Sequence, residues 1–212
     1  MSKNTREKNR ELTEQEKKRT ERTEKTVQSY VDNGYSVTEL TIGIVKANLM
    51  SLIVCLPVIA IFVLWWFLRN TFSHEVMSTK PLTIVVSLII ITVVHELIHA
   101  FFWGVSAPGH FKSIELGFVK EMMTPYCACL EPLTKTQYII GSVAPGVILG
   151  IIPCVIAVLT ANFSLFLFGI IGFISGGGDY QIDLKLLGYK SDKESLLCLD
   201  HPTKVGLMVL EK

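Results

Sequence analysis

Three ionisable side chains lie close together in one apolar segment, as His-Glu-Leu-Ile-His at residues 95–99. If this segment is a helix, His95 and His99 lie one turn apart on one face, where both imidazoles can reach a single metal ion. Glu96 projects about 100° away from His95 around the same helix. That spacing makes its carboxylate a general base for a bound water rather than a ligand. The pattern predicts a zinc site with hydrolytic chemistry.

A catalytic zinc takes three protein ligands and keeps one position open for water, so a third ligand is required. We predict Asp179, which follows a Ser-Gly-Gly-Gly run at the end of a later apolar segment. Glycines allow helices to approach closely and allow a local break that would turn the carboxylate inward. Asp183, one turn later, is the alternative ligand, and a plain helix-end carboxylate is the other interpretation of Asp179.

Apolar helices long enough to cross a bilayer must position these residues. Half of the 212 residues are hydrophobic and 18% are charged, whereas an ordinary soluble domain carries about a quarter charged residues. A transmembrane helix needs about 20 apolar residues, so the 43-residue charge-free stretch 136–178 is long enough for two. We predict an α-helical integral membrane protein with about four transmembrane helices, at residues 47–68, 82–104, 137–160 and 162–178.

The distribution of Lys and Arg predicts the orientation of these helices. Residues 1–46 hold ten of them, the connection between the first two helices holds two, and the turn near Asn162 holds none. Both termini and the 105–135 loop are therefore predicted to be cytoplasmic. In this topology the second and fourth helices run in the same direction, and His95 and Asp179 lie about 20 and about 25 Å along them.

Composition divides the chain into three parts. Residues 1–34 are dense in Lys, Arg, Glu and Thr and predict a charged, disordered cytoplasmic arm, because nothing there would bury a helix. Residues 35–190 predict the membrane-embedded domain, and residues 191–212 a cytoplasmic tail. Two β-prone runs, 114–119 and 124–130, predict a small β-hairpin in the cytoplasmic loop, and 205–210 predicts a further strand.

Other features exclude some functions. The net charge of +1 suggests no nucleic-acid partner. Cys127 and Cys129 form an isolated Cys-x-Cys, with no second Cys or His pair at the spacing of a zinc finger. Trp103 and Tyr138 lie near the ends of predicted helices, where an aromatic belt at the membrane surface is expected.

Four segments in order, VVHELIHAFFWG, TPYCACLEPLTKTQY, SGGGD and DHPTKVGLMV, resemble a family of small bacterial membrane zincin peptidases, related in motif to the site-2 proteases. The resemblance covers roughly residues 30–210. It implies zinc bound by His95, His99 and Asp179, with Glu96 as the base, in a protein of the bacterial plasma membrane. Site-2 proteases carry an Asn-Pro element before their Asp, and SGGGD lacks it, so peptide cleavage is less supported than zinc binding.

We therefore expect a membrane-embedded zinc metallopeptidase. Its partners would be the lipid bilayer and a peptide or membrane-protein substrate. Two alternatives stay open: zinc hydrolysis of a non-peptide membrane substrate such as a lipid, and a non-catalytic membrane protein that acts in binding, immunity or assembly. Structural zinc prefers a closed site with four ligands, and no further His or Cys is evident at the right depth.

Overall fold

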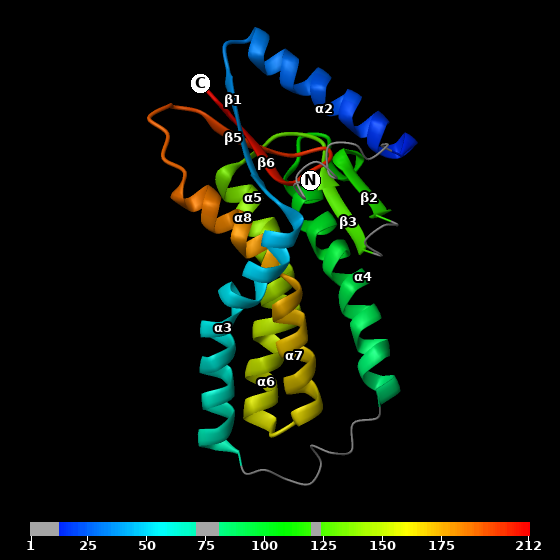
Figure 1. Cartoon of the computed structure of the whole chain (residues 1–212), viewed down its shortest axis with the longest axis vertical. Helices are drawn as coiled ribbons and strands as arrows, with labels where there is room; N and C mark the ends of the chain where they lie inside the picture. Colours follow the sequence, from blue (N-terminus) through cyan, green and yellow to red (C-terminus); the bar gives the residue numbers. More distant parts are fainter. Residues whose placement is uncertain (1–12, 71–80, 120–123) are drawn as a thin grey trace, which may run out of the picture.

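The structure, a computed structural model, describes residues 13–70, 81–119 and 124–212 (Figure 1). Long apolar helices form one end of the molecule, and the strands and one charged helix gather at the other end. In this description three helices are long and apolar enough to cross a membrane, or four if a bent helix pair counts as one span.

Three of these helices coincide with the predicted segments 47–68, 82–104 and 137–160. The fourth predicted segment, 162–178, ends too early, because the bent pair continues to Gly188. The third is one rod built from α5, the π-helical η4 and α6, and the fourth is the pair α7 and α8, which are bent by 47° at Gly176. The bounds are α3 Ile44–Arg69, α4 Pro81–Ser106, α5 Lys135–Pro145, η4 Gly146–Ile151, α6 Ile152–Thr160, α7 Phe163–Ser175 and α8 Gly177–Gly188.

Proline and glycine shape the centre of this bundle. The wide π-helical turns of η4 lie between Pro145 and Pro153, because each proline lacks the N–H that would continue the regular helical ladder. A Cβ on Gly172 would lie 2.2 Å from the carbonyl oxygen of Leu149, so the backbones of α7 and η4 are in contact there. The bundle is therefore close-packed directly beside the first turn of α8.

The strands form two sheets. The predicted hairpin is confirmed, as β2 (Ile114–Val119) paired antiparallel with β3 (Thr124–Cys129), and the predicted C-terminal strand is β6 (Val205–Glu211). Sequence reasoning missed the larger antiparallel sheet, with strand order β1-β6-β5-β4. Its other strands are β1 (Ser36–Ile42), β5 (Leu196–Asp200) and β4 (Leu133–Thr134).

The C-terminal residues share a core with the helices. Leu207 and Val209 of β6 are fully buried in one cluster with Trp103 of α4 and Leu186 of α8. The predicted boundary at residue 190 therefore does not separate two packing units. Composition suggested it because charge rises there, whereas packing is decided by the buried face of β6.

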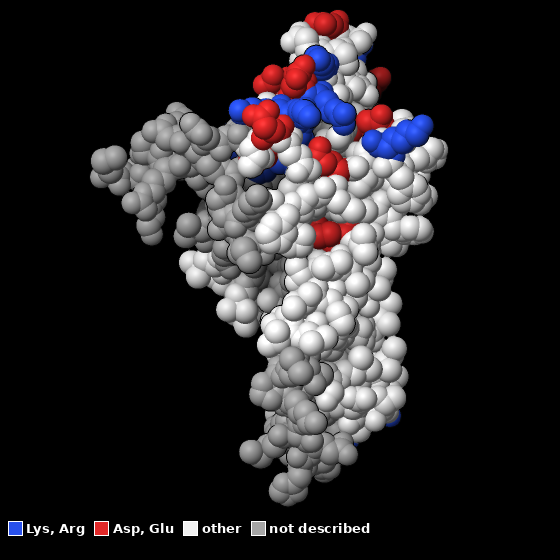
Figure 2. Space-filling view, turned by 90° about the vertical axis from the view of Figure 1, so that its right-hand side faces the viewer, with Lys and Arg blue, Asp and Glu red and all other residues white. Residues whose placement is uncertain are grey.

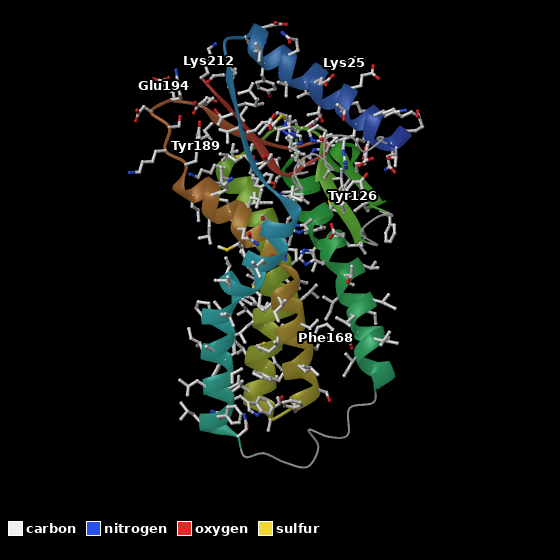
Figure 3. The ribbon with its side chains drawn as sticks, in the orientation of Figure 1. Lys25, Tyr126, Phe168, Tyr189, Glu194 and Lys212 are labelled. Atoms are coloured by element: carbon white, nitrogen blue, oxygen red, sulfur yellow. The ribbon has the colours of Figure 1, made fainter. Side chains whose placement is uncertain are left out.

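The structure differs from the prediction of a disordered arm over helix α2 (Glu14–Asp32); residues 1–12 lie outside the described part. Thr13 caps the helix in a capping box with Glu16. One polar face is buried, and from it the Arg19 guanidinium donates a 2.7 Å hydrogen bond to the Pro202 carbonyl. The side-chain view places Tyr126, on which Arg19 stacks, below α2 (Figure 3). Sequence reasoning looked for an apolar face and therefore missed this docking.

Charge is segregated on the surface. The space-filling view shows Lys, Arg, Asp and Glu gathered mainly at the end that carries α2, with a long uncharged surface over the helices (Figure 2). Large apolar side chains are exposed on both α3 and α4, among them Leu49, Ile53, Ile61, Ile89, Val93 and Leu97.

Candidate metal centre

His95, His99 and Asp179 come together where α4 meets the start of α8. Their ligand atoms all lie within 4.8 Å of one another, and in the described residues they are the one group of three or more His, Cys, Asp or Glu so placed. His95 Nε2 lies 3.1 Å from Asp179 Oδ2 and 3.0 Å from His99 Nε2, and His99 Nε2 lies 3.5 Å from Asp179 Oδ2. The structure thus brings together the three residues predicted as ligands.

Their elements explain this meeting. His95 and His99 lie one turn apart on the buried face of α4. Asp179 lies in the first turn of α8, directly after the bend at Gly176. Without that bend α7 would continue straight, so the predicted glycine break is what gives Asp179 a new helix start beside α4.

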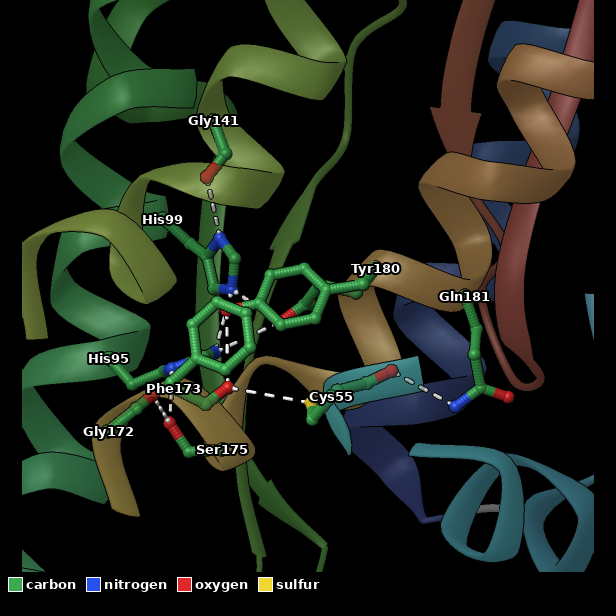
Figure 4. Close-up of polar contacts among 11 residues, drawn as sticks. Cys55, His95, His99, Gly141, Gly172, Phe173, Ser175, Tyr180 and Gln181 are labelled. Carbon is green, nitrogen blue, oxygen red and sulfur yellow. Dashed lines mark hydrogen bonds and ion pairs between the residues drawn. The ribbon is translucent and has the colours of Figure 1, made fainter. Parts of the chain in front are cut away.

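Hydrogen bonds to the far side of each imidazole orient both rings (Figure 4). His99 Nδ1 lies 2.9 Å from the Gly141 carbonyl, which only accepts, so this nitrogen carries the proton. The Ser175 hydroxyl donates to the Gly172 carbonyl at 2.7 Å and lies 3.1 Å from His95 Nδ1, so its oxygen accepts a hydrogen bond from the Nδ1–H of that ring. Each Nε2 therefore presents a lone pair toward Asp179.

With both imidazoles neutral, three acceptors therefore converge on one point, which a proton or a metal ion can occupy. Such an arrangement is unfavourable unless a positive charge lies among them. Ligands about 2.0–2.1 Å from a tetrahedral zinc are about 3.3 Å apart, close to the 3.0–3.5 Å separations of these atoms. Two imidazole nitrogens and one carboxylate fit a catalytic zinc site in number, kind and spacing.

Two aromatic side chains form a stack against the His99 ring. Trp103 stacks on the His99 ring with centroids 4.7 Å apart, and Tyr138 stacks on Trp103 at 5.3 Å. Trp103 Nε1 also donates to the Tyr138 carbonyl at 3.1 Å. Both aromatic residues are buried, so the prediction that they belong to an interfacial belt is wrong. Trp103 follows His99 by four residues and so lies on the same face of α4, and this spacing could have predicted their contact.

Glu96 lies beside the metal group on α4, partly buried. Its carboxylate is close enough to His95, His99 and Asp179 for their charges to interact, and it also interacts with the Cys127 backbone on β3. The hairpin therefore borders the site directly, at the side chain predicted as the base.

The other candidates from the sequence are not members of this group, although they lie near it. Burial raises the pKa of the Cys127 thiol and raises that of Cys129 to about 12, so both stay protonated at neutral pH. Among the described residues, neither cysteine belongs to a group of three or more candidate metal ligands. Asp183, the alternative ligand, is buried one turn beyond Asp179 and is not in the group.

A family profile described as "Putative zincin peptidase" matches residues 88–193, half of the chain. The matched segment runs from the middle of α4 to just beyond α8, and so contains His95, Glu96, His99 and Asp179. No curated protein and no solved structure matches the chain. The family name implies zinc peptidase chemistry, for which the three convergent side chains form a suitable donor set. On this match, the chain belongs to the zincin peptidase family.

Proposed function

We propose that this protein is a membrane-embedded zinc metallopeptidase that cleaves peptide bonds of membrane or membrane-proximal proteins. The observation that carries the proposal is the convergence of three atoms that can ligate a metal, His95 Nε2, His99 Nε2 and Asp179 Oδ2, which all lie within 4.8 Å of one another. Family membership supports the same chemistry.

Insertion in the membrane is supported by the three or four apolar helices and by the large apolar side chains exposed on them. Exposed apolar surface of this extent is costly in water and favourable in lipid. The charged end with α2 and the sheets would lie outside the bilayer. With the Lys and Arg distribution of the sequence, we place that end and both termini in the cytoplasm of a bacterial cell.

In this proposal His95, His99 and Asp179 hold the zinc and leave one position open. Bound zinc lowers the pKa of a water and polarises the scissile carbonyl. Ser175 and the Gly141 carbonyl keep both imidazoles in the tautomer whose Nε2 faces the metal. Glu96 accepts a proton from the attacking water and donates it to the departing amine nitrogen, so that no net proton is gained or lost.

The hairpin gives a route for the substrate. Within the described chain, β3 pairs with β2 alone, and β3 packs on α4 at Glu96. An extended peptide added to the free edge of this hairpin would have its backbone held by main-chain hydrogen bonds. We propose that the substrate binds as such a strand, which brings its scissile bond to the metal centre.

The deciding experiment compares the wild type with Glu96→Gln and His95→Ala, each purified from membranes for metal analysis and expressed for a screen of membrane proteins and lipids. The proposal expects stoichiometric zinc in the wild type and in Glu96→Gln, and loss of zinc in His95→Ala. Glu96→Gln should lower cleavage by about 10²- to 10⁴-fold and leave uncleaved substrate in the cell.

Each other outcome rejects part of the proposal. A wild type without zinc contradicts any metalloenzyme. Accumulation of a lipid instead of a protein in Glu96→Gln would assign the site to a non-peptide substrate. Stoichiometric zinc with no change in any protein or lipid would make this a non-catalytic zinc protein.

A further inference from the structure

We infer that Asp183 is the charge partner of the metal centre: a positioning residue that strengthens zinc binding without ligating the ion. The inference rests on the proposed zinc site. Its basis is the environment of the Asp183 carboxylate. This group is neither a proposed zinc ligand nor part of the proposed reaction.

Asp183 is buried and has no hydrogen-bond partner. Its exposed fraction is 3%, and neither Oδ1 nor Oδ2 has a hydrogen bond of good geometry within the described part of the chain. The Ser142 hydroxyl is close enough to interact with it, but no Lys or Arg of the described residues forms an ion pair with it. An isolated buried carboxylate is costly unless a positive charge compensates it.

The position of Asp183 indicates where that charge would lie. It follows Asp179 by four residues in α8, so both carboxylates lie on the same face of that helix, one turn apart. Asp179 and His99 are close enough for their charges to act on it. The carboxylate therefore lies behind the ligand group, on the side where α8 packs against α5.

The charge balance of the centre then explains why Asp183 is left without a partner. A zinc ion with two neutral imidazoles and Asp179 retains one net positive charge. Coulomb interactions in a buried site fall only slowly with distance, so a carboxylate behind the ligands can balance this charge without contact. With Asp183 neutralising the ion, Glu96 keeps its own charge available for proton transfer.

A direct ligand role is not what the arrangement favours. The ligand atoms that lie within 4.8 Å of one another belong to His95, His99 and Asp179, and Asp183 is not among them. If Asp183 compensates the charge of the ion without contact, Asp183→Asn should weaken zinc binding but leave the coordination of the metal unchanged. If Asp183 is a ligand, the same substitution should also change the coordination.

The test uses Asp183→Asn in the full-length protein, with Asp192→Asn, which removes an exposed carboxylate of the connection after α8, as the matched control. Zinc affinity is measured by competition with a chromophoric chelator, and thermal unfolding is followed without metal. Asp183→Asn should weaken zinc binding by about 10- to 100-fold and raise the melting temperature of the metal-free protein, because a buried unpaired charge is gone. Asp192→Asn should change neither quantity.

Two further measurements complete the test. The Co²⁺-substituted Asp183→Asn protein should keep the wild-type absorption spectrum at saturation, and Asp183→Glu, which retains the charge, should recover most of the zinc affinity. Unchanged zinc affinity in Asp183→Asn, or an altered Co²⁺ spectrum, would overturn the inference. If the wild type itself binds no zinc, the proposed function fails; if the wild type binds zinc and Asp183→Asn binds it equally well, only the role of Asp183 fails.

Discussion

Asp200, at the end of β5, and Asp183, in α8, are two carboxylates inside the molecule with opposite surroundings. Asp200 accepts hydrogen bonds from the Tyr138 hydroxyl and the Cys129 backbone N–H, each at 2.7 Å. Asp183 accepts none of good geometry. The first joins α5 to β3 across the charged end, and the second lies beside the candidate metal centre.

The charged end and the helical region differ in the same way, in whether their buried polar groups have hydrogen-bond or ion-pair partners. At the charged end, the Arg19 guanidinium lies 3.6 Å from Glu115 and stacks on Tyr126, whose hydroxyl donates to Glu115 at 2.9 Å. In the helical region, the ligand atoms of His95, His99 and Asp179 converge on one point, and Asp183 has no hydrogen bond of good geometry. Most polar groups named at the charged end are thus paired with one another, although Glu211 Oε2 on β6 is buried without a partner. Beside α4 and α8, by contrast, the side chains form a donor set for a cation, which is the property expected of a functional site.

The largest loss of stability is expected from Asp200→Ala. The Tyr138 hydroxyl and the Cys129 N–H would both lose their acceptor, and each orphaned donor costs about 1–3 kcal/mol, so the free energy of unfolding should fall by about 2–6 kcal/mol. Unfolding in detergent measures this effect. Zinc affinity should fall less than in Asp183→Asn, because Asp200 interacts with His99 more weakly than with Tyr138 and the Cys129 N–H. A loss of zinc affinity as large as that of Asp183→Asn, in a still-folded Asp200→Ala protein, would show that the two regions are not separate.

Tyr138→Phe is a smaller change that tests one of the two hydrogen bonds to Asp200. It removes one hydrogen bond to Asp200 but keeps the ring that stacks on Trp103. A hydrogen bond to a charged acceptor contributes about 1.5–3 kcal/mol, so we expect a loss of stability at the low end of this range. The same unfolding experiment measures this loss. If Tyr138→Phe lowered the free energy of unfolding as much as Asp200→Ala does, the hydrogen bond from the Cys129 N–H would contribute nothing, contrary to our expectation.

Arg19→Ala should affect α2 alone. The substitution removes the hydrogen bond to the Pro202 carbonyl, the stacking on Tyr126 and the ion pair with Glu115, together worth about 2–4 kcal/mol. Limited proteolysis should then cleave within α2 at sites that are protected in the wild type, while the melting temperature of the remainder changes little. Arg19→Lys, which cannot reproduce the planar stacking, should give partial release, and unchanged protection in both variants would reject this docking.

The smallest effect is expected at Glu39, an exposed carboxylate on β1. Its hydrogen bond with Lys204 lowers its pKa below the ordinary 4.5, with a further contribution from the charge of His201. The stability from this pair is present above about pH 4.5 and is lost as pH falls through the lowered pKa. Glu39→Gln should cost less than about 1 kcal/mol at neutral pH and nothing in acid, with the difference reduced by salt. A cost that persists at acidic pH would exclude an ionic origin.

Much of the helical region could be predicted from local patterns. Uninterrupted apolar stretches gave the helix positions, and the i, i+4 spacing of His95 and His99 gave two neighbouring side chains. Asp179 could be chosen because two helices running in the same direction bring equal depths together. These inferences depend on periodicity and length, which are properties of short segments.

The charged end was predicted less well because its contacts join distant segments. β1 pairs with β6 from the opposite end of the chain, and Arg19 reaches Pro202 across 183 residues. A run such as residues 38–45 leading into the first helix gives no indication of which strand it will meet. The docking of α2 through polar side chains has no hydrophobic pattern that could have revealed it.

The sequence alone determined the types and the helical spacing of His95, Glu96 and His99, because these are local properties. It also determined which segments form the apolar helices, except that α8 extends the last one from residue 178 to Gly188. Only the tertiary structure decided how those residues are used. The bend at Gly176 turns Asp179 toward the histidines, and Ser175 and the Gly141 carbonyl select the tautomers. Packing also left Asp183 buried without a partner. Each of these depends on which backbones touch across the bundle, and a one-dimensional pattern does not contain that information.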